Sequence, residues 1–132
     1  MDATRPAARP AAWCIDDAHA EHGRFKDYRK KHPRETAKCE DNLRRVLVQL
    51  QATDSPEAFR FNFFRHESGQ VWRIGQTGLA GAKETRLYVY LFLFGRTIYK
   101  LSIGGKERQR QDIARCVELA ETIRKQAEGT AK

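Results

Sequence analysis

The sequence predicts one small α+β domain. Apolar residues recur at helical spacing in the first third and at the end of the chain, while the middle alternates or runs apolar as strands do. The length of 132 residues suits one domain. We expect a domain over residues 12–126, a disordered tail at residues 1–11 and a frayed tail at residues 127–132. The predicted architecture is an N-terminal short strand and helical pair, a four-stranded antiparallel sheet and a C-terminal helix.

The N-terminal third supplies the short strand and the helical pair. The apolar stretch Ala12–Ile15 predicts the strand, and the acidic pair after it can cap a helix. A first helix is expected over residues 18–31, and Pro33 interrupts it because proline disfavours helical geometry in the residue before it. A second helix is expected from Arg34 to Gln51, with apolar residues three or four positions apart along one face. These apolar residues are Cys39, Leu43, Val46, Leu47 and Leu50.

The middle of the chain supplies the sheet. The phenylalanines of residues 59–63 alternate with polar residues, which predicts a strand, and residues 71–74 predict a second one. The run from Thr85 to Phe94 is apolar on both faces, as in a central strand. Gly95-Arg96 then predicts a tight hairpin turn that returns along residues 97–103.

The C-terminal part supplies the last helix. It is expected from Lys106 to Lys125, after Gly104-Gly105 ends the preceding strand. Its apolar residues share one face, so this helix should dock on the sheet by a single stripe. These residues are Ile113, Cys116, Val117, Ala120 and Ile123.

The charge of the chain favours an anionic partner. Lys and Arg number 25 against 17 Asp and Glu, a net charge of +8, and nucleic acid is the first candidate for such a chain. Residues 24–45 carry a net +5 and residues 100–110 a net +3. The longest apolar run, Leu87 to Phe94, is far shorter than the ~20 residues of a membrane-spanning helix. Three cysteines without CxxC spacing disfavour a disulfide framework or a zinc site. We therefore expect a cytoplasmic protein with no membrane contact, metal or cofactor.

The segment from Thr85 to Leu119 resembles the closing half of the RelE/HigB family of bacterial toxins, in the addiction-module killer branch of the RelE/ParE superfamily. The resemblance rests on Arg86 at the start of the central strand, on the Gly95-Arg96 hairpin and on the motif residues from Gly104 to Ile113. Upstream only the layout agrees, so the resemblance covers about residues 12–125.

This resemblance implies the toxin of a type II toxin–antitoxin system, a metal-independent endoribonuclease that cleaves messenger RNA on the ribosome and inhibits translation. The catalytic cations of the family map onto Arg86, Lys106 and Arg108, which would stabilise charge on the phosphoryl oxygens. The implied partners are a cognate antitoxin, messenger RNA and the ribosome, with a dimer or a heterotetramer with the antitoxin as the assembly. Further RNA-binding candidates are Arg73, Lys100, Arg110, Arg29, Lys30 and Lys31.

The proton donor and acceptor are less well defined. Family members often place a Tyr or His in or near the last helix, whereas the matching stretch here offers Gln109 and Asp112. His66 and Asp112 are therefore the candidate acid–base residues. Two other functions stay open: a gyrase-inhibiting toxin of the ParE kind, which needs no catalytic residues, and a non-catalytic RNA- or DNA-binding module. The run Arg29–Lys31 has an equally good explanation as a solvated helix end.

Overall fold

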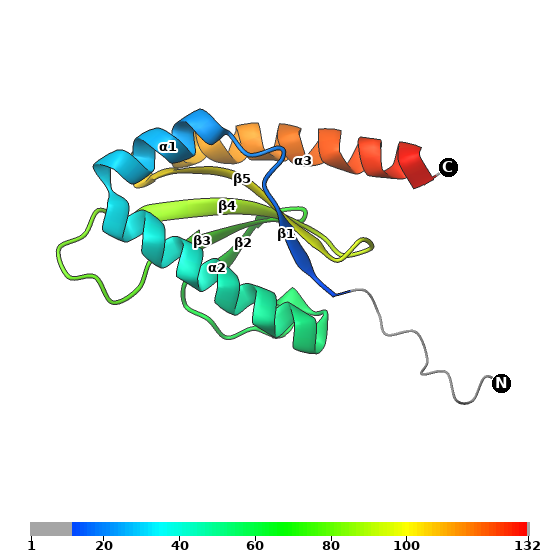
Figure 1. Ribbon diagram of the computed structural model, residues 1–132, viewed down its shortest axis with the longest axis horizontal. Coiled ribbons are helices and arrows are strands. Elements are labelled where there is room, and N and C mark those ends of the chain that lie inside the picture. Colours follow the sequence, from blue (N-terminus) through cyan, green and yellow to red (C-terminus); the bar gives the residue numbers. More distant parts are fainter. Residues whose placement is uncertain (1–11, 132) are drawn as a thin grey trace.

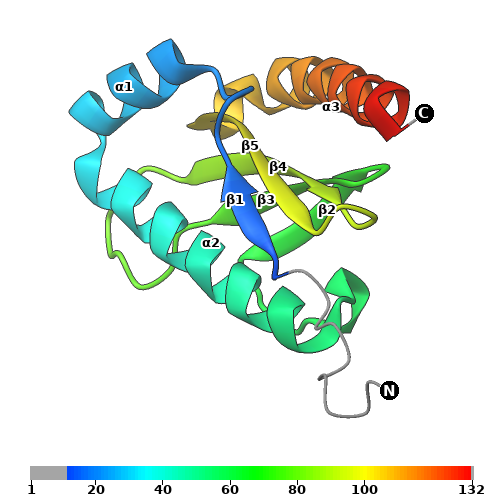
Figure 2. The same cartoon turned by 45° about the vertical axis from the view of Figure 1, so that its right-hand side comes forward.

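The computed structural model describes residues 12–131, and the predicted disordered tail at residues 1–11 lies outside the described residues. A sheet forms the middle layer, with α2 on one side and α3 on the other, and α1 crosses near one end (Figures 1 and 2). In chain order the elements are β1 (Cys14–Asp16), α1 (His22–Lys31), α2 (Pro33–Thr53), the 3₁₀ turn η2 (Pro56–Ala58), β2 (Phe64–Ser68), β3 (Val71–Gly75), β4 (Thr85–Phe92), β5 (Thr97–Gly105), the 3₁₀ turn η3 (Lys106–Arg108) and α3 (Gln109–Ala131).

The sheet has five strands in the order β1-β5-β4-β3-β2, so the prediction of a four-stranded antiparallel sheet is wrong. β2 to β5 are antiparallel neighbours, as expected. The fifth strand is β1, which pairs in parallel with β5 and places Ile15 opposite Ile98. A three-residue apolar stretch identifies a short strand, but it carries no information on which distant strand it will join.

β4 is the central strand and its two faces have different neighbours. Leu87, Val89 and Leu91 face α2 and belong to the larger core cluster. Tyr88 and Tyr90 face the opposite way and pack with α3. Both faces are covered, which agrees with the predicted central strand and explains why this strand has no polar face.

The phenylalanine segment at residues 59–63 is not the predicted strand, because pairing begins only at Phe64. Its rings instead pack beside the end of α2. Phe61 and Phe63 are stacked with ring centroids 4.6 Å apart, and the guanidinium carbon of Arg45 lies 4.9 Å and 5.0 Å from these centroids. Alternating aromatic residues therefore reflect packing beside a helix here, although the backbone oxygen of Phe63 at the end of the segment accepts a hydrogen bond from the backbone nitrogen of Gly75 of β3 at 2.8 Å.

Several boundaries differ from the predicted ones. α1 begins at His22 rather than at residue 18, and α3 begins at Gln109 and runs to Ala131. The hairpin turn has four residues, Leu93–Arg96, and Arg96 rather than Gly95 takes the left-handed conformation, with φ of 48°. Gly95 is required for a different reason, since a Cβ at this position would lie 2.8 Å from the ring of Phe92.

Candidate functional site

Arg86 lies on β4 with a glycine opposite it on each neighbouring strand. It is in register with Gly75 of β3 and with Gly104 of β5. Neither neighbouring strand therefore places a side chain beside Arg86. The flank next to Gly75 is an open cavity, and other side chains fill the flank next to Gly104.

The Arg86 side chain is only 9% exposed. Its Nη2 donates a hydrogen bond to the carboxylate of Glu84, whose side chain is 57% exposed. Its Nη1 is buried and has no hydrogen-bond partner among residues 12–131. Burial of an unused donor is unfavourable. An anionic oxygen that reached Nη1 would gain a charge-assisted hydrogen bond.

Two further arginines lie on the same face of the neighbouring strands. Arg73 of β3 is in register with Tyr88, and Arg65 of β2 is in register with Arg73. Arg73 is held by Glu67 (Nε–Oε2 3.2 Å) and by Gln109 (Nη1–Oε1 3.4 Å), whereas Arg65 is exposed. Like charges directly opposite each other destabilise a sheet, and the Glu67 carboxylate offsets the charge of Arg73 here. These residues form the arginine row: Arg65, Arg73 and Arg86.

A cavity of about 220 Å³ opens on the Gly75 side of Arg86. Arg73 and Arg86 supply positive charge to it and Glu84 supplies one carboxylate. The full lining is Asn62, Phe63, Arg73, Gly75, Gln76, Glu84, Thr85 and Arg86. A cavity with two guanidinium groups, one of them desolvated, is suited to a phosphate group because guanidinium hydrogen bonds match its oxygens.

The loop between β3 and β4 forms one wall of this cavity, and the Gln76 side chain joins the two ends of the loop. The Gln76 side chain donates to the backbone oxygen of Lys83 (2.7 Å) and accepts from the backbone nitrogen of Thr85 (2.9 Å). Asn42 of α2 donates to the backbone oxygen of Gly75 at 2.8 Å. The cavity wall is therefore anchored to both strands and to the helix behind the sheet.

Asp112 and Arg24 fill the other flank of Arg86. A Cβ at Gly104 would overlap Asp112 Oδ2 and would lie 2.6 Å from Arg24 Nη2. Arg24 donates to both carboxylate oxygens of Asp112, at 2.6 Å and 3.3 Å, and Arg108 Nε lies 3.6 Å from Oδ1. Asp112 is 2% exposed and Arg24 is 27% exposed, so the carboxylate of this ion pair is shielded from solvent, and the pair joins α1 to the start of α3.

The structure brings four of the predicted site residues to one end of the sheet. Arg73 and Arg86 line the cavity, and Lys106 and Arg108 lie in η3, directly after the strand that carries Gly104. Lys106 and Arg108 are exposed, and so is Arg110 at the start of α3. These cations could contact a ligand that extends beyond the cavity.

Three other predicted cations lie elsewhere. Lys100 is in register with Val89 and therefore faces α2, where its Nζ lies 4.8 Å from the ring centroid of Phe25 and 3.0 Å from Glu40. Arg29 also pairs with Glu40, at 2.8 Å. Lys30 is exposed on α1, and it is not among the residues that line a hollow between α1 and η3, whereas Lys31 is.

Neither of the two predicted acid–base residues, His66 and Asp112, is both close to Arg86 and accessible to solvent. His66 is in register with Trp72, on the α2 face, and its Nε2 lies 2.6 Å from the backbone oxygen of Gly69. Asp112 is buried in its ion pair with Arg24. Tyr88 is fully buried and is not among the residues that line the cavity, and its burial raises the pKa of its hydroxyl.

Three residues of this region were not among the predicted site residues: Arg24, Arg65 and Glu84. Arg65 could have been found from the strand pattern if the register of β2 on β3 had been known. Glu84 stands two residues before Arg86, so both side chains point to the same side of an extended chain. The sequence around Arg24 does not indicate its role, because its ion-pair partner Asp112 is 88 residues away in the chain.

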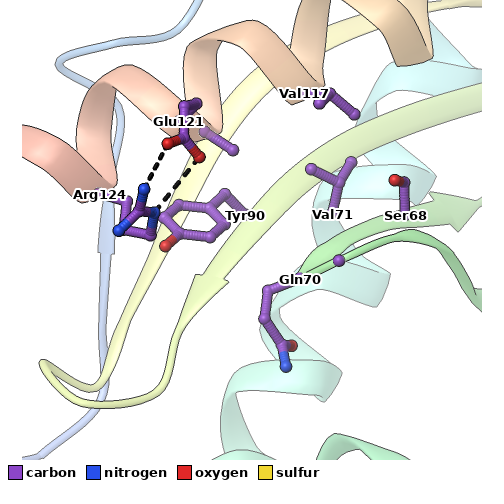
Figure 3. A pocket seen from close by; sticks show the side chains of 9 residues that line it. Ser68, Gln70, Val71, Tyr90, Val117, Glu121 and Arg124 are labelled. Carbon is purple, nitrogen blue, oxygen red and sulfur yellow. Dashed lines mark hydrogen bonds and ion pairs between the residues drawn. The ribbon is translucent and has the colours of Figure 1, made fainter.

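A second cavity, of about 380 Å³, lies between α3 and the β2–β3 turn. Figure 3 shows Val71, Tyr90 and Val117 among the side chains that line it, with Gln70 and Ser68 at the turn. Its cation, Arg124, is already bound by Glu121 and Glu128. This cavity is mostly apolar and its charge is neutralised, so it is a poorer anion site than the cavity beside Arg86.

None of the helices between residues 12 and 131 is both long and apolar enough to cross a membrane. The same part of the chain holds no group of three or more His, Cys, Asp or Glu able to bind a metal ion. The chain has no significant match among protein-family models, curated proteins or solved structures.

Proposed function

We propose that this protein is the toxin of a type II toxin–antitoxin system, of the RelE/HigB kind, and that its arginine row binds the phosphates of messenger RNA. The observation that carries the proposal is Arg86, which is nine-tenths buried on a central strand, has a buried Nη1 without a hydrogen-bond partner among residues 12–131, and lines a cavity together with Arg73. The order of strand, helix pair, antiparallel strands and helix supports a RelE/ParE-like layout. A cytoplasmic antitoxin would cover the basic surface.

The proposed reaction is metal-independent cleavage of RNA. A 2′-hydroxyl loses its proton, attacks the adjacent phosphorus and expels the 5′-oxygen, which takes up a proton. Arg86 and Arg73 stabilise the negative charge that develops on the phosphoryl oxygens, and one such donor is worth roughly 2.7–4 kcal/mol in analogous sites. Glu84 is the carboxylate that lines the cavity, so we assign it as the proton acceptor. Lys106 and Arg108 hold the flanking phosphates.

Induction in a bacterial host tests this function. The wild-type chain should arrest growth and leave cleaved transcripts, whereas Arg86→Ala and Arg86→Lys should do neither, because lysine keeps the charge but loses the guanidinium geometry. Arg44→Ala is the matched control, since Arg44 is 65% exposed on α2 and its ion pair, among the described residues, is with Asp41 one turn away on the same helix. Thermal unfolding should show that the Arg86→Lys variant remains folded.

Three outcomes separate the competing functions. Growth arrest with intact transcripts and inhibited supercoiling by purified gyrase would favour a ParE-like toxin. RNA binding without growth arrest would favour a non-catalytic module. Unchanged arrest and unchanged cleavage by Arg86→Ala would show that the arginine row is not the site.

A further inference from the structure

A second basic hollow lies beside the Arg24–Asp112 ion pair. It has a volume of about 460 Å³ and lies between α1 and η3. We call it the α1 groove, and its lining residues are Arg24, Asp27, Tyr28, Lys31 and Arg108.

One face of α1 supplies four of these residues. Positions 24, 27, 28 and 31 follow the three- and four-residue spacing that places side chains along one side of a helix. Lys30 is turned about 100° from Lys31 around the helix axis and is not among the lining residues. The groove therefore distinguishes two adjacent lysines that the sequence presents as one basic run.

The α1 groove has an excess of positive charge. Its lining holds three cations and one carboxylate, Asp27. Arg24 and Arg108 share the single buried carboxylate of Asp112, and Arg108 remains 58% exposed. Lys31 is exposed and forms no ion pair within residues 12–131. The carboxylates that contact these cations do not balance all of their positive charge, so the groove attracts an anion.

The lining also indicates which kind of anion fits. Within the described part of the chain no aliphatic residue lines the groove, so a helix or strand of a partner protein would lack the apolar anchors that such docking requires. A positively charged groove with an aromatic side chain is the usual arrangement for single-stranded nucleic acid. The aromatic side chain here is Tyr28, whose ring lies 4.7 Å from that of His32.

The groove is connected to the arginine row. The Tyr28 hydroxyl is hydrogen-bonded to Oγ1 of Thr85 at 2.7 Å, and Thr85 is the residue before Arg86. On the other side, Asp112 contacts the groove residues Arg24 and Arg108 and lies over Gly104, the partner of Arg86 in the sheet. The Arg24–Asp112 pair and the Tyr28–Thr85 hydrogen bond therefore lie between the groove and Arg86, so a strand bound at Arg86 would reach the groove by passing over polar side chains.

We propose that the α1 groove binds the backbone of the RNA strand that continues from the phosphate held by Arg86. This inference rests on the proposed function and adds the path of the substrate. It assigns Lys31 and Arg108 to phosphate contacts and leaves Lys30 outside the interface.

Lys31→Gln against Lys30→Gln tests this path, since both lysines are exposed and neither substitution should affect folding. The probes are labelled RNAs with 2′-O-methyl groups, which prevent cleavage. One has about three nucleotides, fewer than a typical single-strand site, and the other about twelve, within the range of such sites. Each phosphate contact lowers the slope of log K against log salt by about 0.7, or about fivefold in affinity between 1 M and 0.1 M salt. For Lys31→Gln, the slope of log K against log salt should be smaller in magnitude by about 0.7 on the long RNA and unchanged on the short RNA. Lys30→Gln should match wild type on both RNAs.

The failures are distinguishable. If Lys31→Gln equals Lys30→Gln on the long RNA while Arg86→Lys weakens both RNAs, the groove inference is wrong and the proposed function stands. If wild-type protein binds neither RNA, the proposed function fails and the inference fails with it. If a poly-glutamate peptide binds in a Lys31-dependent way and the long RNA does not, the groove binds an acidic protein segment and the inference is overturned.

Discussion

Arg24 of α1 and Asp112 of α3 form a buried ion pair directly over Gly104 of β5. The pair joins the two helices across the end of the sheet and occupies the space that glycine leaves beside Arg86. Three segments that are far apart in sequence therefore depend on one contact. This contact also separates the cavity beside Gly75 from the α1 groove.

We predict that Gly104→Ala lowers the free energy of unfolding by about 1–3 kcal/mol, as overpacking of a filled interior does. The added Cβ would overlap Asp112 Oδ2 and crowd Arg24. Gly23→Ala is the control, because nothing lies within 4 Å of a Cβ there, and it should stabilise by about 0.5 kcal/mol. Urea unfolding midpoints measure both, and equal midpoints would contradict the filled flank.

We predict that Asp112→Asn destabilises the fold by about 2 kcal/mol. This is less than the ~3–5 kcal/mol of a fully buried pair, because the Arg24 side chain is 27% exposed. A double-mutant cycle with Arg24→Gln should give a coupling energy of about 1–2 kcal/mol. Additive effects of the two substitutions would show that the pair does not hold α1 to α3.

We predict that Glu84→Gln changes RNA binding and RNA cleavage in opposite directions. The wild-type carboxylate bonds Arg86 Nη2 and repels a phosphate, so the amide should bind non-cleavable RNA more tightly. Loss of the proton acceptor should slow cleavage by about 10²-fold or more. Fluorescence anisotropy and a cleavage assay on the same RNA measure the two effects. Faster cleavage by the variant would exclude Glu84 as the base.

We predict one fast and two slow thiols in the native protein. Burial raises the pKa of Cys39 and of Cys116 to about 12, whereas Cys14 is exposed. Near pH 8 about one in 10⁴ of the two buried thiols is ionised, so they should react with Ellman's reagent only after unfolding. Cys14→Ser should remove the fast phase. Three equal rates would mean that α2 and α3 open readily.

We predict that Asp54 makes the fold more sensitive to acid. Arg96 and the indole of Trp13 donate hydrogen bonds to its carboxylate and hold its pKa below the ordinary value of 3.8. A lowered native pKa stabilises the fold above the unfolded value and loses this effect as pH falls through the native value. The difference in Tm between wild type and Asp54→Asn should therefore be larger at pH 6 than at pH 2.5. Asparagine also accepts the left-handed φ of 57° at this position.

Much of the fold could be predicted because it depends on local periodicity. The apolar stripe of α2, the two-sided burial of β4 and most of the docking stripe of α3 follow from spacing along a single element. Val117 is the exception, because this predicted member of the α3 stripe is 39% exposed. The same reasoning placed Arg73 and Arg86 on strands. It failed at residues 59–63, where alternating phenylalanines pack beside α2 instead of pairing in the sheet.

The sequence by itself determined the α+β class, the helical and strand segments and the basic character of this protein, since each depends on residues close together in the chain. Only the tertiary structure decided the parallel pairing of β1 with β5, the register that aligns Arg65 with Arg73, and the contact of Arg24 with Asp112. It also separated Lys31 from Lys30. These features depend on strand register and on helix orientation, and both are set by packing between residues that lie tens of positions apart.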